Sequence, residues 1–289
     1  FIGFALSKNM ATYTAFSPFR AVGSVCNEVP ISATTLYGEP LLMAPLGHSF
    51  LLYRGKELTM LRGGPTFENP VSCVSTTGRF RYAGEGANIH AFSHHKPLWT
   101  LPHADITQSK VKLLLARDEI LISYGTDNMI VVRHAKTGDV LQQMAVDGQD
   151  RVTCMIFLEG YTNKLLVGTD RGALQLFNFR TGALLLNHRV ETADGRVTSL
   201  TSSPYKDIIA FGTSRGRLVV LNIASLDEIS SFRHEGVAVT AVAFREDKDG
   251  FIVSGTSAGE IAVWDLQNRA LDGVLTRSKQ VASRHEAFE

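Results

Sequence analysis

Four copies of one short phrase recur along the chain at nearly equal intervals, and this period constrains the fold more than any other feature. The copies begin at Gly125, Gly168, Gly212 and Gly255, and each reads Gly-Thr-Asp or Gly-Thr-Ser. Successive copies are therefore 43 or 44 residues apart. Each copy follows one short apolar run and precedes another. The repeat unit thus contains two strands that are joined by a tight turn.

The repeat predicts an all-β propeller of the WD40 type. A period of about 40–45 residues with a strand–turn–strand pattern is typical of that fold. Short runs of Val, Ile, Leu and Phe suit strands that are buried on both faces, as in a blade held between two others. No segment has the sustained 3.6-residue apolar period that a helical solenoid needs. Only Trp264-Asp265 keeps the literal dipeptide. We predict structural roles for these two residues and for Gly168, Gly212 and Gly255.

Two weaker copies upstream, over residues 46–53 and 83–92, bring the number of predicted blades to six. We expect a single propeller domain over 1–289, with blade repeats at about 31–61, 71–101, 111–144, 152–187, 197–233 and 238–275. Residues 16–26 are predicted to form an N-terminal strand, and 276–289 a polar tail or the start of a missing blade. A seven-bladed ring that lacks most of its seventh blade explains both ends. A closed six-bladed ring is the alternative.

Composition limits the possible functions. The chain has 29 basic and 28 acidic residues, a net charge of +1, whereas a nucleic-acid binder that works through bulk charge has a clear basic excess. Any RNA contact must therefore be local. The three cysteines, Cys26, Cys73 and Cys154, are widely spaced without a C-x-x-C pair, which favours a reducing compartment. No apolar stretch reaches 18 residues, so we expect no membrane span.

The catalytic and metal-binding motifs lack their structural context. Residues 212–216 and 255–259 match G-x-S-x-G, but a nucleophile elbow needs a helix after the serine, and here a strand is predicted. We therefore interpret Ser214 and Ser257 as turn residues. His90 and His94 could share one face of a strand, but no cysteine or carboxylate completes a metal shell. There is no phosphate-binding G-x-x-x-x-G-K-[ST] loop. The sequence predicts a non-enzyme without catalytic residues, cofactor or metal.

Two arginines stand out because they occupy the same turn in successive repeats. Arg171 and Arg215 should project from one face of the ring, with Arg217 nearby. Typical WD40 blades have Asp in this turn, within a buried His–Ser–Asp–Trp network, so Arg171, Arg215 and Ala258 predict that the network is lost. The arginines are either solvated turn residues or a contact to an acidic partner or an RNA backbone. Replacing Arg171, Arg215 and Arg217 with Ala is expected to leave folding intact, since exposed turn residues contribute under about 0.5 kcal/mol.

Several segments together resemble one family of tandem-propeller proteins. The family is the WD-repeat subunit of the UTP-B subcomplex of the small-subunit processome, and the resemblance covers the first propeller, from about residue 16 to 271. The opening phrase is the most specific, since generic WD repeats do not supply it. The segments that carry the resemblance are Phe19–Gly23, Cys26–Pro30, Gly47–Phe50, Asn163–Gly168, Gly172–Asn178 and Gly255–Leu266.

The resemblance implies a nucleolar scaffold. Such a protein would assemble with the other UTP-B subunits and processome proteins around pre-ribosomal RNA and its guiding small nucleolar RNA, and would support pre-18S rRNA processing without catalysing it. It implies no small-molecule substrate and no membrane partner. A WD40 scaffold of another complex, such as a ubiquitin-ligase substrate receptor or a trafficking coat, is the alternative. A propeller enzyme is a third class, and it would require a convergent polar or metal-binding channel.

Overall fold

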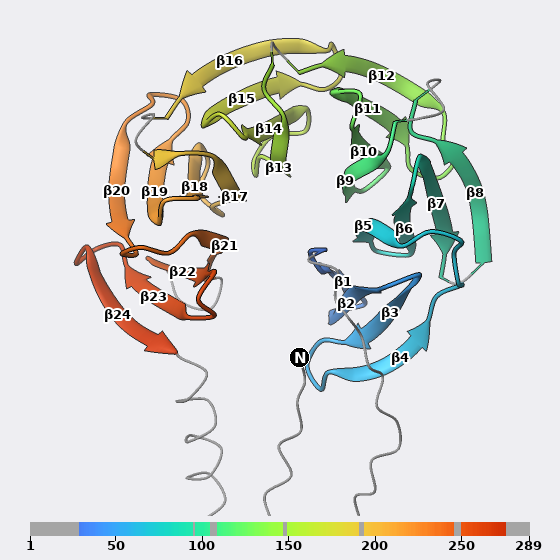
Figure 1. Ribbon diagram of the computed structural model, residues 1–289, viewed down its shortest axis with the longest axis horizontal. Coiled ribbons are helices and arrows are strands. Elements are labelled where there is room, and N and C mark those ends of the chain that lie inside the picture. The colour runs from blue at the N-terminus through green and yellow to red at the C-terminus, as the bar shows by residue number, and fades with distance from the viewer. Residues whose placement is uncertain are drawn as a thin grey trace, which may run out of the picture.

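The computed structural model describes residues 29–94, 96–104, 109–146, 149–190, 194–245 and 250–275. These residues form six four-stranded antiparallel sheets and no α-helix. Figure 1 shows the sheets side by side around a common axis, each with its first strand innermost and its fourth strand at the rim. The predicted all-β propeller is confirmed. The strand predicted at 16–26 and the segment 276–289 lie outside the described residues.

The six sheets, which we number as blades, contain consecutive strands. Blade 1 contains β1 (Ser32–Leu36), β2 (Glu39–Leu46), β3 (Ser49–Arg54) and β4 (Thr59–Gly63). Blade 2 contains β5 (Val71–Thr77), β6 (Phe80–Glu85), β7 (Asn88–Ser93) and β8 (Lys96–Pro102). Blade 3 contains β9 (Val111–Arg117), β10 (Ile120–Gly125), β11 (Met129–His134) and β12 (Val140–Ala145).

The second half of the arc follows the same pattern. Blade 4 contains β13 (Val152–Phe157), β14 (Lys164–Thr169), β15 (Ala173–Asn178) and β16 (Ala183–Arg189). Blade 5 contains β17 (Val197–Ser202), β18 (Ile208–Thr213), β19 (Arg217–Asn222) and β20 (Glu228–Arg233). Blade 6 contains β21 (Val239–Phe244), β22 (Phe251–Thr256), β23 (Ile261–Asp265) and β24 (Ala270–Leu275).

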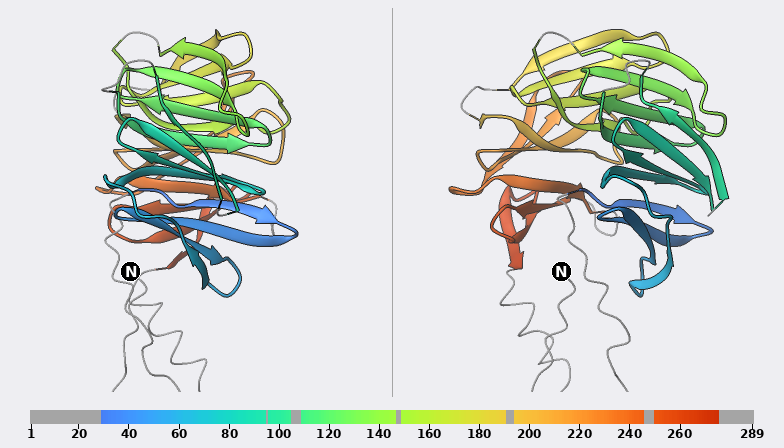
Figure 2. Two further views of the ribbon diagram at one scale, coloured as in Figure 1. Left: turned by 90° about the vertical axis from the view of Figure 1, so that its right-hand side faces the viewer. Right: turned by 45° about the vertical axis from the view of Figure 1, so that its right-hand side comes forward.

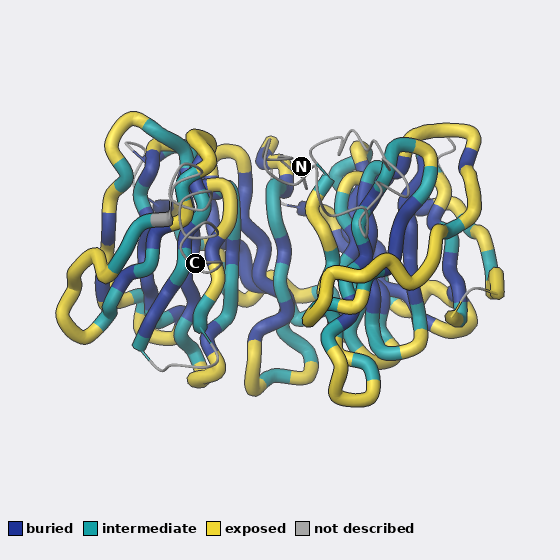
Figure 3. The backbone as a smooth tube through the Cα atoms, turned by 90° about the horizontal axis from the view of Figure 1, so that it is seen from below, coloured by how far each residue is buried: buried dark blue, intermediate teal, exposed yellow. Residues whose placement is uncertain are grey.

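Strand direction alternates within each blade, so two kinds of connection meet at one end of the sheets. These are the turns between second and third strands, and the loops that lead from one blade to the next. We call this end the turn face; in blades 3 to 6 its turns are residues 126–128, 170–172, 214–216 and 257–260. The side views of Figure 2 show the blades following one another around the axis, and Figure 3 shows buried strands between exposed loops at both ends.

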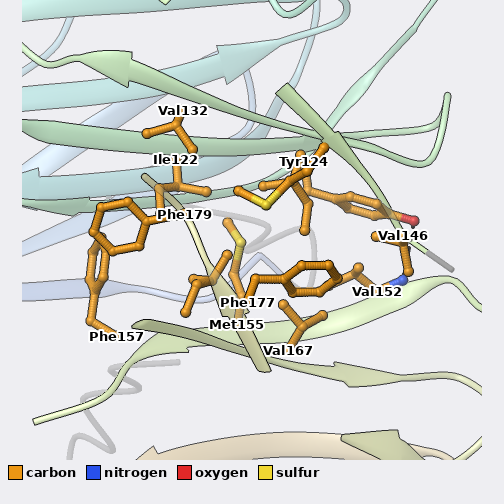
Figure 4. Packing of buried hydrophobic residues seen from close by; sticks show 13 residues of the cluster. Ile122, Tyr124, Val132, Val146, Val152, Met155, Phe157, Val167, Phe177 and Phe179 are labelled. Atoms are coloured by element: carbon orange, nitrogen blue, oxygen red, sulfur yellow. Dashed lines mark hydrogen bonds between the residues drawn. The ribbon is translucent and has the colours of Figure 1, made fainter. Parts of the chain in front are cut away.

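The core consists of apolar layers between neighbouring blades. Five buried clusters occur among the described residues, and each joins one blade to the next, from blades 1 and 2 through to blades 5 and 6. Figure 4 shows the layer between blades 3 and 4, where Ile122 and Val132 face Phe177 and Phe179. None of these clusters joins blade 6 to blade 1. Figure 1 accordingly shows an open arc, with β24 and β1 on either side of the opening.

The strand pairing shifts the alignment of the Gly125 copy, which lies in blade 3, by one residue relative to the other copies. Leu121 pairs with Arg133 where Ile252 pairs with Trp264, so Tyr124, and not Gly125, is equivalent to Gly255. The left-handed turn position of blade 3 is then Asn128, with φ of 65°, where blade 6 has Gly259 at 82°. Because Asn tolerates this conformation, the blade needs no glycine there, and the Gly-Thr match alone misplaced the register.

Gly168 and Gly212 are required by contact with the next blade. A Cβ atom on Gly168 would lie 2.7 Å from Cγ1 of Val197, and one on Gly212 would overlap Cγ1 of Val239. Both valines begin the innermost strand of the following blade. At Gly255 the nearest atoms to such a Cβ belong to Thr240 and Ala241 of the same blade, at 3.7 Å or more.

We therefore expect Gly212→Ala to destabilise the protein by about 1–3 kcal/mol, the usual cost of overpacking a well-packed core. The clash is with Val239, so Gly212→Ala/Val239→Ala should be less destabilised than the sum of the two single variants. Urea denaturation of the three variants and the wild type measures both effects. Strict additivity would show that the two residues do not press on each other.

Trp264 anchors blade 6. Its side chain is 8% exposed and stacks on Phe232 of blade 5, with ring centroids 4.7 Å apart. Its Nε1–H donates to Ser254 Oγ at 2.8 Å. The adjacent Asp265 accepts the backbone N–H groups of Gln267 and Asn268, which closes the turn that follows.

Replacing Trp264 with Ala should lower the free energy of unfolding by about 3–5 kcal/mol, as for other buried aromatic residues. Trp264→Phe keeps most of the packing but leaves Ser254 without the indole donor, so it should cost about 1–3 kcal/mol. The two variants are compared by urea denaturation. Equal losses would show that the hydrogen bond, and not the ring packing, dominates.

Candidate partner-binding site

Part of the polar network expected of WD40 blades survives in two blades. In blade 3, His103 contacts Ser123 at 2.9 Å and Asp127 at 3.4 Å. In blade 6, His234 contacts Ser254 at 2.8 Å, and Ser254 also accepts the Trp264 indole N–H. Burial lowers the pKa of both histidines. The predicted loss of the network beside Ala258 is therefore wrong, because Ser254 links His234 to Trp264 without the missing Asp.

Blades 4 and 5 have lost the network, as predicted. Val190 is equivalent to His234, because both follow a rim strand and donate the backbone N–H to a turn glycine. Val190 donates to Gly172 of blade 4, and His234 donates to Gly216 of blade 5. Val146 takes this position ahead of blade 4. In the pairing of second and third strands, the position of Ser254 is occupied by Val167 in blade 4 and by Phe211 in blade 5. Apolar packing thus replaces the polar network in these two blades and leaves their turns free to carry other side chains.

A pair of hydrogen bonds ties each turn to the neighbouring loop in blades 3 to 6. In blade 5, Ser214 N–H donates to the carbonyl of Arg196 at 2.9 Å, and Arg196 N–H donates to Ser214 Oγ at 3.2 Å. Ser257 makes the same two bonds with Ala238. Both serines of the G-x-S-x-G matches are therefore turn residues, and each is followed by a strand. The same pair of bonds joins Thr126 with Lys110 and Asp170 with Arg151.

Arg171 lies on the turn face as predicted and is 51% exposed. Its Nη2 donates to Gln149 at 2.8 Å, and its Nε lies 3.8 Å from a carboxylate oxygen of Asp150, which is nearly buried. Arg215 occupies the equivalent turn position of blade 5 and is also exposed. The structure thus places both side chains on one face.

Arg217 differs from these two residues. It begins β19, is 18% exposed, and donates at 2.6 Å to both Asp194 and Glu228. Burial lowers the pKa of Arg217, but these two carboxylates outweigh that effect and raise it. Asp194 is only 1% exposed and also lies 3.6 Å from Arg233. The expectation that all three arginines are exposed turn residues is wrong for Arg217, because this residue begins β19 and pairs with a buried carboxylate.

Arg217→Ala should destabilise the protein by about 3 kcal/mol or more, because removing one partner of a buried ion pair leaves the other charge uncompensated. Arg196→Ala, an exposed neighbour, should change stability by under about 0.5 kcal/mol and is the matched control. Urea denaturation measures both variants. In the double variant Arg217→Ala/Asp194→Ala part of the loss should be recovered, and a fully additive loss would contradict the pairing.

The turn face carries further exposed arginines that were not predicted from the sequence. Arg151 and Arg196 occupy equivalent positions in the loops that lead into blades 4 and 5, and both precede Val-Thr. This Arg-Val-Thr repeat was the signal that could have revealed them. Arg189 and Arg233 end the rim strands β16 and β20 and are also exposed. Asp147 and Glu191, which belong to the same loops in sequence, lie outside the described residues.

Other kinds of site are less well supported. Among the described residues no group of three or more His, Cys, Asp or Glu side chains could hold a metal ion. His90 instead lies 2.8 Å from Glu85 and contacts Thr100. Cys73 and Cys154 are free, and burial raises the pKa of each to about 12, so neither is a reactive thiolate. None of the described segments forms an apolar helix of membrane-spanning length.

The four-stranded blades, the bonds between turns and loops, and the surviving His–Ser–Trp arrangement define a β-propeller of the WD-repeat class. Within that class, residues 42–287 match the family described as WDR36/Utp21 first beta-propeller. The chain belongs to this family.

Known relatives agree with this assignment. The chain is 28% identical over 265 residues to the U3 small nucleolar RNA-associated protein 21 homolog of Schizosaccharomyces pombe, covering 90% of the chain and 29% of the relative. It is 24% identical over 268 residues to human WD repeat-containing protein 36, covering 92% and 30%. U3 small nucleolar RNA-associated protein 21 of Saccharomyces cerevisiae is 28% identical over 274 residues, covering 90% and 28%. The chain thus spans under a third of the length of these relatives.

A similar fold also occurs in a solved structure, that of the computationally designed Ika8 protein. The TM-score is 0.65 at 23% identity, over 81% of this chain and 71% of the other. At this identity the likeness concerns the fold alone.

Proposed function

We propose that this chain is a non-catalytic interaction scaffold in ribosome biogenesis. It would act in assembly of the small-subunit processome and in pre-18S rRNA processing with the U3 small nucleolar ribonucleoprotein. The family match over residues 42–287 carries this proposal, and two relatives are named for association with U3 small nucleolar RNA. A rigid arc with loops at both ends suits the role, because loops can vary while the blades hold their positions.

The proposed partners are the other UTP-B subunits and processome proteins, in the nucleolus. Protein contacts would supply most of the binding, because a net charge of +1 gives little non-specific attraction to RNA. Within the proposal, Arg171 and Arg215 offer one local contact to an anionic group, whereas Arg217 is engaged with Asp194 and Glu228. The catalytic motifs lack their structural context, which supports a scaffold over a propeller enzyme.

The outward face of blade 6 supports the further proposal of a seventh blade. In blades 4 and 5 the second residue of the innermost strand, Thr153 or Thr198, donates its hydroxyl to the carbonyl of Val197 or Val239 in the next blade. Thr240 has the same place in blade 6, where it donates to the carbonyl of Gly255. Blade 6 therefore has, at Thr240 and Gly255, the same threonine and glycine that contact the next blade in blades 4 and 5.

Gly255→Ala tests the seventh blade. In the 289-residue chain the added methyl group meets only ordinary contacts, so stability should change by under about 0.5 kcal/mol. In the full-length protein a seventh blade would press a side chain against it, as Val239 does at Gly212, at a cost of about 1–3 kcal/mol. Urea denaturation of both lengths decides this, and an equally small effect in both would contradict the proposal.

Affinity purification of the tagged full-length protein tests the scaffold role. We expect U3 small nucleolar RNA and the other UTP-B subunits to copurify with the wild type. Trp264→Ala, which is expected to destabilise blade 6, should recover less of them, whereas the exposed substitution Arg196→Ala should not change their recovery. Recovery of ubiquitin-ligase adaptors or vesicle-coat subunits, without U3 small nucleolar RNA, would favour the alternative scaffold.

A further inference from the structure

The fourth strand of every described blade contains a bulge at the same place. A shift of register leaves one residue of each rim strand without a partner in the third strand. Such a bulge bends the strand and turns the extra side chain in a new direction. The unpaired residues, in blade order, are Leu61, Leu98, Leu141, Leu185, Ile229 and Asp272. In blades 1 to 5 this side chain is therefore aliphatic, and it is exposed in each of them.

Blades 3 and 4 carry a second exposed aliphatic residue beside the bulge. Val140 precedes Leu141 in β12. Leu184 precedes Leu185 in β16, and the two bulge leucines are each 51% exposed. In blades 2, 5 and 6 the corresponding pair of positions contains Pro97, Glu228 or Asp272. Because β12 and β16 follow each other along the rim (Figure 1), the four residues form one surface, which we call the rim patch.

An apolar groove lies between blades 3 and 4 beside the rim patch. Its volume is about 290 Å³, and Leu141 of the rim patch forms part of its wall. The other lining residues are Ile120, Val132, Gln142, Phe179 and Arg180. The equivalent space between blades 5 and 6, which Ile208, Val220 and Ile229 line, measures about 90 Å³. Since a cavity of about 150 Å³ holds a benzene-sized group, the larger groove has room for a large apolar side chain.

Contact between the two blades holds the walls of this groove in place. Phe179 is buried and belongs to the same apolar layer as Val132. A Cβ atom on Gly182 would overlap Nε2 of Gln142, so the last turn of blade 4 lies directly against the rim strand of blade 3. The groove is therefore already formed before any partner binds, which lowers the ordering cost of binding.

Arg180 is the one ionisable residue among the described residues that line the groove. Its side chain is exposed and forms no ion pair with a described residue. The acidic residues of the nearby turns of blade 3, Asp118, Glu119 and Asp139, do not line the groove. Asp139 also accepts a hydrogen bond from Thr137 Oγ1 at 2.6 Å. The groove thus combines apolar walls with one cation, which complements an apolar side chain that lies next to a carboxylate.

We propose that the rim patch and the groove bind an amphipathic helix of a partner protein, with a carboxylate of that helix on Arg180. This inference rests on the proposed function, since it names what one surface of the scaffold holds. In a helix the side chains at positions i, i+3, i+4 and i+7 share one face. Such a face can place one apolar side chain in the groove and others on the aliphatic pairs of both blades.

The bulges favour a helix over an added strand. A strand that pairs with β12 or β16 would reach the exposed pair of one blade only. It would also meet an edge whose pairing is interrupted at Leu141 or Leu185, and bulges protect edge strands from such pairing. A helix that crosses the blade boundary contacts both pairs through side chains and needs no backbone hydrogen bonds to the rim.

The test measures fluorescence anisotropy of a labelled model peptide with the full-length protein. The peptide forms a helix with leucine along one face and glutamate beside that face. A peptide of the same composition but permuted order, whose leucines are spread around the helix, is the control probe. We expect the wild type to bind the amphipathic peptide at least about 10-fold more tightly than the permuted one.

Substitutions at the bulges locate the binding surface. Leu141→Ser/Leu185→Ser should weaken binding of the amphipathic peptide by at least about 10-fold, because two apolar contacts are lost. The matched control Leu61→Ser/Leu98→Ser changes the same bulge position in blades 1 and 2, and it should change binding by less than about 2-fold. Thermal melting of both variants should match the wild type, since all four leucines are exposed.

A charge reversal tests the same site without removing apolar surface. Arg180→Glu should weaken binding of the glutamate peptide by several-fold, and a peptide with lysine in place of glutamate should recover the affinity for this variant. Because the reversal is compensated by the peptide, recovery of binding also shows that the variant is folded.

Three outcomes would overturn the proposal. The first is equal binding of the amphipathic peptide by the Leu141→Ser/Leu185→Ser variant and its control. The second is equal binding of the amphipathic and permuted peptides by the wild type, or no effect of the charge reversal. The third is a dimer of the wild type in sedimentation analysis that Leu141→Ser/Leu185→Ser dissociates, since the rim patch would then join two copies of the chain.

Failure of the proposed function gives a different result. Copurification of the wild-type protein with U3 small nucleolar RNA does not depend on which peptide the rim patch binds. A wild type that copurifies with this RNA but does not bind the amphipathic peptide would overturn only the rim-patch proposal. A wild type that binds the peptide but never copurifies with the RNA would overturn the proposed function.

Discussion

Apolar contact between neighbouring blades is the constraint on which the rest of this structure depends. A four-stranded sheet made of Val, Ile, Leu and Phe has two apolar faces, and neither can be buried within the blade itself. Each of the five buried clusters therefore joins one blade to the next. Only glycine fits at positions 168 and 212, because a valine of the next blade lies close to each. The hydroxyl groups of Thr153 and Thr198 donate hydrogen bonds to the carbonyls of the same valines.

Because this packing supplies the stability, the polar network of the turn face can change without loss of the fold. Blades 3 and 6 retain histidine and serine, whereas blades 4 and 5 have valine in the histidine position and arginine in the turn. The bonds between turn and loop are the same in all four blades. The frame of the turn face is thus constant, and its side chains differ from blade to blade. This difference concentrates arginines over blades 4 and 5.

Much of the candidate site could be predicted from particular residues. The repeat placed Arg171 and Arg215 in equivalent turns, and the absence of a helix after Ser214 and Ser257 argued against a nucleophile. The ion-pair partner of Arg217 could not be predicted in this way. Arg217 lies close to Arg215 in sequence, yet it binds the buried carboxylate of Asp194, 23 residues earlier. Arg196 was detectable only through its similarity to Arg151, and its approach to Arg171 depends on two glycines that face each other across a blade boundary.

The sequence by itself determined the strand-forming period, the all-β class and the family, because these follow from local apolar patterning and from the spacing of turn residues. Tertiary structure alone decided the register of the first repeat, where Asn128 adopts the left-handed conformation assigned to glycine elsewhere. It also decided which arginines are structural and which face solvent. The physical reason is that burial and charge pairing depend on contacts between blades, and residues that meet across a blade boundary are separated by about half a repeat or more of chain.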